Sequence, residues 1–142
     1  VIGDYLKREC IPVTVGSPAY IPCVDTIRMP LRESFVSMDE MYSTFFHEVG
    51  HSVGHVSRLA RFSDAQTKLE QKEEYSREEL VAEIFSAVLC HGCGVDSEAS
   101  IKNSAAYLQG WSRFIKDEAE AFVWAVNQAY KARAFVLGGE GA

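Results

Sequence analysis

The sequence lacks a long hydrophobic run. A membrane-spanning helix needs about 18 or more consecutive apolar residues, and charges or glycines interrupt every apolar segment well before that length. The first ten residues, VIGDYLKREC, carry charges where a secretory signal peptide would have an apolar core. We therefore expect no contact with a membrane, and a cytoplasmic protein.

An excess of positive charge is also missing. The chain has 14 lysine and arginine residues against 20 aspartate and glutamate residues, for a net charge of −6. Domains that bind nucleic acids usually present a basic face, so we expect this domain itself to bind none. Its 142 residues, 47% of them hydrophobic, suffice for one domain with a real core. We expect residues 1–142 to form a single domain, excised from a longer protein because the chain begins with Val1.

Cysteine is sparse, with four residues in the chain. Cys90 and Cys93 have the spacing of a metal or redox pair, but a structural zinc site would need a second close pair. Cys10 and Cys23 lie too far apart in the sequence to form one. We expect reduced, partly buried thiols and assign no role to Cys90 and Cys93.

Local patterns predict a small α+β domain. Residues 1–10 fit a short helix, residues 11–15 a strand, and residues 19–30 two short strands around a turn near Val24 and Asp25. Ser37 and Glu40 form a capping box at the start of a helix over 38–54.

Two further helices follow in the second half of the chain. Ser76 and Glu79 suggest another capping box, for a helix that ends at Gly92 and Gly94, after a polar, exposed connection over 56–74. A long C-terminal helix, bent or broken in its middle, should begin near Asn103 or Ser104. It would bury a stripe of large residues at helical spacing: Leu108, Trp111, Ile115, Phe122, Val126 and Tyr130.

The motif that indicates chemistry is His47-Glu48-Val49-Gly50-His51, an HExxH sequence inside the first of these long helices. Residues four apart lie on one helix face, one turn from each other. His47 and His51 can therefore bind one zinc ion, and Glu48 can act as the general base that takes a proton from a zinc-activated water.

A catalytic zinc ion needs a third protein ligand and one open position. His55 could serve only if the helix broke at Gly54. Glu79 and Glu83 are four residues apart and share a helix face. An acid followed four residues later by another acid or amide, after HExxH, is the glutamate-zincin arrangement. It favours Glu79 as the ligand and leaves Glu83 as its outer support or as the alternative ligand.

Four segments together resemble the metallopeptidase domain of ArdC-type antirestriction proteins. They are AYIPCVDTIRMP, YSTFFHEVGHSVGHVSRLAR, EEYSREELVAEIFSAVL and NSAAYLQGWSRFIKDE, and the resemblance runs from about Tyr20 to about Phe135. It implies a zincin-like fold: a small sheet on the HExxH helix, a glutamate-bearing helix and a long C-terminal helix. It also implies a bacterial protein associated with a plasmid or phage. The DNA-binding domain of such proteins is absent from this chain.

The functional expectation is a zinc-dependent metallopeptidase acting on a protein or peptide. His47, His51 and Glu79 would hold zinc, and Glu48 would be the catalytic base. The alternative is a non-catalytic zinc-containing module that mediates protein interaction or antirestriction. Four residues are open as stabilisers of the reaction's oxyanion: Tyr75, His55, His91 and Tyr107. The segment 19–22 could form an edge strand that aligns a peptide.

Overall fold

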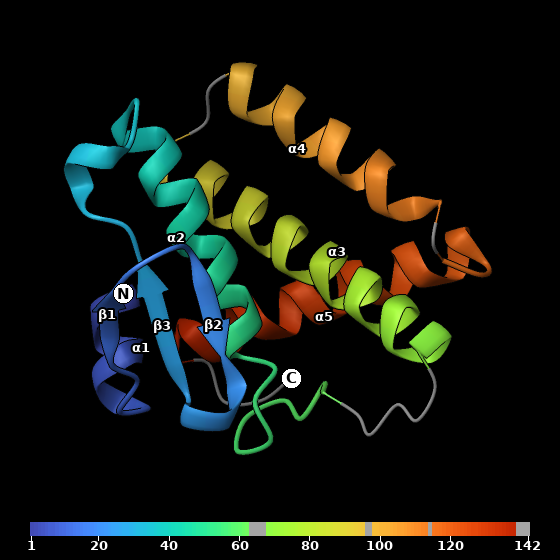
Figure 1. Ribbon diagram of the computed structural model, residues 1–142, viewed down its shortest axis with the longest axis horizontal. Helices are drawn as coiled ribbons and strands as arrows, with labels where there is room; N and C mark the ends of the chain where they lie inside the picture. The colour runs from blue at the N-terminus through green and yellow to red at the C-terminus, as the bar shows by residue number, and fades with distance from the viewer. Residues whose placement is uncertain (63–67, 96–97, 114, 139–142) are drawn as a thin grey trace.

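The computed structural model describes residues 1–62, 68–95, 98–113 and 115–138. The chain begins with α1 (Ile2–Arg8), β1 (Val13–Val15), β2 (Ala19–Ile21), the 3₁₀ turn η1 (Pro22–Val24) and β3 (Thr26–Met29). A second 3₁₀ turn, η2 (Arg32–Ser34), leads into four longer helices: α2 (Met38–Ser52), α3 (Lys68–Cys93), α4 (Glu98–Ser112) and α5 (Glu118–Val136). The predicted α+β architecture, with a small sheet beside the HExxH helix, is confirmed (Figure 1). Among the described residues no helix is long and apolar enough to span a membrane.

The sheet has the order β1-β3-β2 within the described residues. β1 runs parallel to the central strand β3 and β2 antiparallel to it, with Tyr20 opposite Ile27. Asp25, in the predicted turn, adopts a left-handed conformation with φ of 47°. Strand β2 is therefore an edge strand, as the segment 19–22 suggested, and it packs on α2.

Helix α2 begins where the capping box predicts. The side chain of Ser37 accepts a hydrogen bond of 3.1 Å from the backbone N–H of Glu40. The Glu40 carboxylate in turn accepts one of 2.8 Å from the N–H of Val36. The first bond satisfies an N–H group that a helix start leaves without a partner, and the second holds the residue before the cap against Glu40.

The predicted start of the next helix is wrong. Helix α3 begins at Lys68, and Ser76 lies in its interior, where its hydroxyl donates to the carbonyl of Lys72 at 2.8 Å. The segment 68–74 is rich in Lys, Glu and Gln, which favour helix, so the helix extends upstream of the apparent cap. The rest of the predicted connection lies partly outside the described residues.

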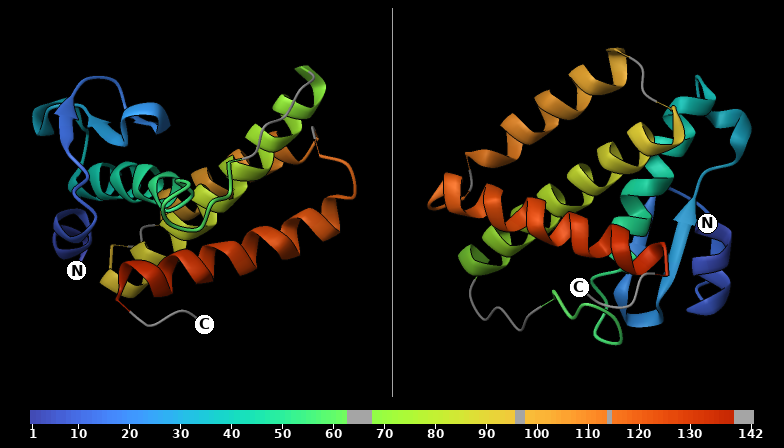
Figure 2. Two further views of the ribbon diagram at one scale, coloured as in Figure 1. Left: turned by 90° about the horizontal axis from the view of Figure 1, so that it is seen from below. Right: turned by 180° about the vertical axis from the view of Figure 1, so that it is seen from behind.

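The C-terminal helix is broken in its middle, into α4 and α5, and α4 begins at 98 rather than 103. Its predicted stripe is wrong for Phe122 and Tyr130, which are 48% and 55% exposed. Instead α5 buries a face of small residues: Ala121, Ala125, Ala129 and Ala132. Small side chains allow α5 to approach α3 closely, and α5 packs on α3 and crosses it at an angle (Figures 1 and 2). The Trp111 side chain lies outside the described part.

The core joins the sheet to the helices. Tyr5, Ile27, Val49, Val53 and Phe85 are fully buried in one cluster, contributed by α1, β3, the end of α2 and α3. Helix α3 packs against α2, α4 and α5 and so forms the centre of the helical part. None of the four cysteines forms a disulfide bond: Cys90 is buried, and Cys10, Cys23 and Cys93 are exposed.

Close contact between α2 and α3 depends on Gly50 of the HExxH motif. A Cβ atom at this position would lie 2.9 Å from Cδ1 of Phe85 and 3.1 Å from Cα of Ala82. Real Cβ contacts are longer than this, so only glycine fits here without movement. The residue that separates the two histidines in sequence therefore also brings their helix against α3.

Candidate metal centre

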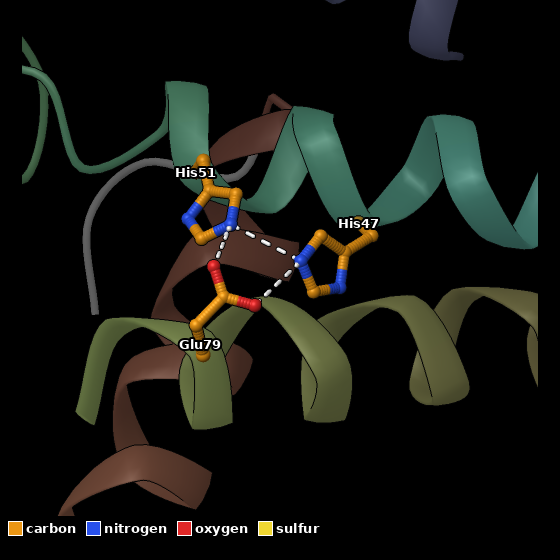
Figure 3. Close-up of side chains that lie close together, drawn as sticks. All are labelled: His47, His51 and Glu79. Atoms are coloured by element: carbon orange, nitrogen blue, oxygen red, sulfur yellow. Dashed lines mark hydrogen bonds and ion pairs between the residues drawn. The ribbon is translucent and has the colours of Figure 1, made fainter. Parts of the chain in front are cut away.

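His47 and His51 on α2 face Glu79 on α3 (Figure 3). The two imidazole Nε2 atoms are 3.1 Å apart. Glu79 Oε1 lies 3.1 Å from Nε2 of His51, and Glu79 Oε2 lies 3.3 Å from Nε2 of His47. These are the three residues that the described part of the chain brings together as possible metal ligands.

The triangle fits a zinc ion. Bonds of about 2.0–2.1 Å in a tetrahedral arrangement place neighbouring ligand atoms roughly 3.3 Å apart. The two Nε2 atoms are 3.1 Å apart, and each lies 3.1 to 3.3 Å from one of the two Glu79 oxygens, which is close to that value. Two imidazoles and one carboxylate also form a ligand set of catalytic zinc sites, which keep a fourth position open.

The outer nitrogen of each histidine meets another carboxylate of α3. Nδ1 of His47 lies 3.0 Å from Glu83 Oε2, and Nδ1 of His51 lies 3.3 Å from Glu78 Oε1. Such contacts orient an imidazole and fix the proton on Nδ1, which leaves Nε2 free for a metal. The structure thus places Glu83 behind His47 and outside the triangle.

Sequence reasoning missed Glu78 and its partner Arg61. Arg61 donates from Nε to Glu78 Oε2 at 2.9 Å and from Nη2 to Glu78 Oε1 at 2.7 Å. The same Nη2 donates to the carbonyl of Gly50 at 2.6 Å. Arg61 therefore ties the residues after α2 to α3 beside His51. The sequence gives little indication that Arg61 contacts Glu78, because Arg61 lies in a polar segment with the composition of an exposed surface.

Strong electrostatic interactions hold the cluster. Burial alone would lower the pKa of His47, but hydrogen bonds to Glu79 and Glu83 outweigh it and raise the pKa to about 10. Burial raises the pKa of Glu79, but the hydrogen bonds from His47 and His51 outweigh it and hold that pKa far below its usual value. Without metal the site therefore holds imidazolium and carboxylate together. It stabilises positive charge at the point where a metal ion would sit.

Glu48 lies next to the triangle and is 8% exposed. Burial raises its pKa, although the nearby His51 and His47 oppose the shift. The backbone N–H of Tyr20 on the edge strand β2 donates a hydrogen bond to its carboxylate. A carboxylate with a raised pKa accepts protons more readily near neutral pH, as a general base requires.

Two of the four oxyanion candidates lie at the cluster. The Tyr107 hydroxyl donates to Glu79 Oε2 at 3.0 Å. Tyr75 has its pKa raised by burial and by the charge of Glu79, to which it is also hydrogen-bonded. His55 instead bonds Ser57 at 2.7 Å beyond the end of α2. His91 is twelve residues after Glu79 on α3, about 18 Å along a helix.

A cavity of about 450 Å³ opens beside the triangle, between the start of α2, α3 and α4. Glu83 and Tyr107 form its wall toward the histidines, and Asp39, Ser43 and Asn103 are among its other lining residues. Cavities of about 300–1,000 Å³ hold small ligands or side chains. The centre therefore has an adjoining space that a substrate group could enter.

Residues 9–128 match the zincin-like metallopeptidase family. The chain belongs to this family. Its similarity to an ArdC antirestriction protein, expected from the four segments, is also confirmed. The Mn(II)-bound crystal structure of ArdC from the R388 plasmid is 29% identical and has a TM-score of 0.68. That match covers 96% of this chain and 51% of the ArdC chain. The metal-free ArdC structure is 27% identical, with a TM-score of 0.61, over 98% of this chain and 51% of that one.

Two Escherichia coli proteins described as DNA primase TraC are also similar to this zincin-like domain. Each is 36% identical over 118 residues, which cover 83% of this chain but only 8% and 11% of the two relatives. This chain thus spans a small part of the TraC proteins and about half of ArdC. The family and the Mn(II)-bound relative, together with the triangle of His47, His51 and Glu79, support a divalent metal ion as cofactor, for which zinc is suitable.

Proposed function

We propose that this domain is a zinc-dependent metallopeptidase-type hydrolase. His47, His51 and Glu79 hold the metal, and Glu48 is the general base. The observation that carries the proposal is the group of His47, His51 and Glu79, in which the two Nε2 atoms are 3.1 Å apart and each lies 3.1 to 3.3 Å from a Glu79 oxygen, with a buried acid of raised pKa beside it. Glu83 and Glu78 are positioning residues, because each holds the outer nitrogen of one histidine.

The metal ion and the side chains of the protein contribute different parts of the proposed chemistry. When bound, zinc lowers the pKa of a coordinated water toward about 7 and polarises the substrate carbonyl. The carboxylate of Glu48 accepts the proton from the attacking water and returns it to the leaving amine. Burial raises the pKa values of Glu79, Glu83 and Glu78, but hydrogen bonds outweigh it and keep these carboxylates charged. The bonds come from the histidines for Glu79 and Glu83, and from Arg61 and then His51 for Glu78.

Strand β2 supports a protein or peptide as the substrate. It lies at the edge of the described sheet, and the N–H of its residue Tyr20 reaches Glu48. An extended peptide that pairs with this edge would run past the base and the metal. It would compete with Glu48 for the Tyr20 N–H, which would release the Glu48 carboxylate toward water.

Glu48→Gln tests the catalytic role, because it keeps the size of the side chain and removes the base. The protein is loaded with zinc and incubated with a mixture of unstructured peptides, whose new termini are counted by mass spectrometry. We expect cleavage by the wild type, its loss with a chelator, and a decrease of about 10²–10⁴-fold in Glu48→Gln with zinc still bound. Equal cleavage by the two proteins would show that Glu48 is not the general base.

A second candidate is a zinc-containing module without catalysis, which mediates protein interaction or antirestriction. The relatives favour it in one respect, since their names refer to antirestriction and DNA priming rather than to proteolysis. By analogy with the R388 protein we place the domain in a plasmid- or phage-associated protein of the bacterial cytoplasm, with a protein rather than a nucleic acid as its direct partner. Antirestriction that persists in Glu48→Gln would support this module over the hydrolase.

A further inference from the structure

We propose that Tyr107 is a positioning residue that makes Glu79 bind the metal through one oxygen only. The fourth coordination position would then stay open for the reacting water. This inference rests on the ligand set of the proposed function. Tyr107 acts on the metal through Glu79.

Tyr107 approaches the centre from α4, which packs on α3 and also contacts α2. Its hydroxyl donates to Glu79 Oε2 at 3.0 Å. Its ring stands edge-on to the imidazole of His47, with centroids 6.0 Å apart and an interplanar angle of 88°. One side chain thus contacts two of the three presumed ligands, and its ring is held at a defined angle while its hydroxyl bonds the carboxylate.

The two oxygens of Glu79 differ in their surroundings. Oε1 lies 3.1 Å from Nε2 of His51, while Oε2 lies 3.3 Å from Nε2 of His47 and also accepts the bond from Tyr107. A hydrogen bond to an ionised carboxylate is about twice as strong as one between neutral groups. A metal that took both oxygens would compete with this bond, so the arrangement favours coordination through Oε1.

The number of bound oxygens decides whether the site can work. Two imidazoles and a carboxylate bound through both oxygens would supply four donor atoms, and a water would then make the ion five-coordinate. With one oxygen they supply three, which is the number that catalytic zinc sites provide. The hydroxyl of Tyr107 would therefore decide whether the ion with its water is four-coordinate or five-coordinate, with the same three ligand residues.

Tyr107→Phe removes the hydroxyl and keeps the ring against His47. Because Tyr107 is 43% exposed, we expect folding to be preserved, and circular dichroism checks it. Tyr130→Phe is the matched control, since Tyr130 is 55% exposed on α5 and outside the group of possible ligands. Each protein is titrated with zinc against a chromophoric chelator and then loaded with Co²⁺, whose visible absorption weakens as coordination rises from four to five.

We expect Tyr107→Phe to bind zinc about 10–100-fold more weakly, as loss of a group that orients a ligand usually does. Its Co²⁺ bands should weaken, because Glu79 is then free to bind through both oxygens. Tyr130→Phe should match the wild type in both measurements.

An unchanged zinc affinity in Tyr107→Phe overturns the inference. A weaker affinity with an unchanged Co²⁺ spectrum also overturns it, because the hydroxyl would then not control how Glu79 coordinates. A wild type that binds neither metal overturns the inference and the proposed function together. A wild type that binds zinc and shows the expected difference, but cleaves no peptide, supports the inference and rejects the hydrolase.

Discussion

Gly50→Ala tests whether the close contact between α2 and α3 builds the metal centre. The new Cβ would lie 2.9 Å from Cδ1 of Phe85 and 3.1 Å from Cα of Ala82. Carbon atoms pack best about 3.5–4.0 Å apart. The Phe85 ring must therefore turn and the two helices must separate by roughly half an ångström, because Ala82 Cα belongs to the backbone and cannot move alone.

Two effects of opposite sign determine how much Gly50→Ala changes the free energy of unfolding. Overpacking a close-packed core costs about 1–3 kcal/mol, whereas alanine is better than glycine inside a helix by about 1 kcal/mol. Gly110→Ala supplies the control, because Gly110 lies within α4 and nothing stands within 4 Å of its added Cβ. The difference between the two variants isolates the overlap. We expect Gly50→Ala to be less stable than Gly110→Ala by about 1–3 kcal/mol.

Thermal unfolding of the metal-free proteins measures this difference. For a chain of this size 1 kcal/mol shifts Tm by about 3 °C, so Gly50→Ala should melt about 3–9 °C below Gly110→Ala. Separation of the helices also moves His47 and His51 away from Glu79, so the zinc affinity of Gly50→Ala should fall while that of Gly110→Ala does not. If Gly50→Ala melted no lower than Gly110→Ala and bound zinc like the wild type, the contact would be loose and the reasoning would fail.

Two further predictions concern the groups that support the site. Glu78→Gln removes the charge that faces Nδ1 of His51 and Arg61. It should weaken zinc binding about 10–100-fold. Competition with a chelator measures the zinc affinity, and Glu120→Gln, on the exposed start of α5, is the control. An affinity equal to that of Glu120→Gln would show that Glu78 does not orient His51. Asp25→Asn tests a second network, in which Asp25 bonds Arg58 and the Tyr20 hydroxyl; burial raises the pKa of Asp25, but the bonds from Arg58 and Tyr20 outweigh it and hold the pKa below its usual value. Because the folded pKa is lowered, the stabilisation is present above the unfolded value of about 3.9 and is lost as pH falls through the folded value. Urea unfolding should therefore find that the advantage of the wild type over Asp25→Asn is full at pH 7 and shrinks as the pH falls below about 3.9, and a difference that does not depend on pH would contradict the role of this charge.

The parts of the fold that local signals determine were predictable. Helix α2 was expected over 38–54 and is found over Met38–Ser52, because its capping box and its apolar spacing both lie within the helix. The turn at Asp25 and the short strands around it were also expected from local residues. In these segments the capping box and the turn residues that predict the structure lie within a few residues of one another.

The start of α3 and the buried face of α5 could not be predicted in this way. Ser76 has the local pattern of a cap, yet the helix continues through it because the residues before it also favour helix. Helix α5 contains both large and small apolar residues, and the face that is buried depends on how near α3 lies. Because α5 approaches α3 closely, the buried face of α5 consists of small residues, among them Ala121, Ala125 and Ala129. Phe122 and Tyr130 remain exposed.

The roles of the three acids on α3 follow from which imidazole nitrogen each one faces. Glu83 and Glu78 meet the two Nδ1 atoms, and Glu79 meets both Nε2 atoms. Spacing along α3 places Glu79 and Glu83 on one face. Spacing alone does not decide which of them reaches the Nε2 atoms, because that depends on the point along α3 at which α2 crosses it. Gly50 permits that crossing and Arg61 holds it beside Glu78. In the proposed site the HExxH sequence supplies two ligands and a base, and Gly50 permits the close helix contact at which Glu79 meets both Nε2 atoms.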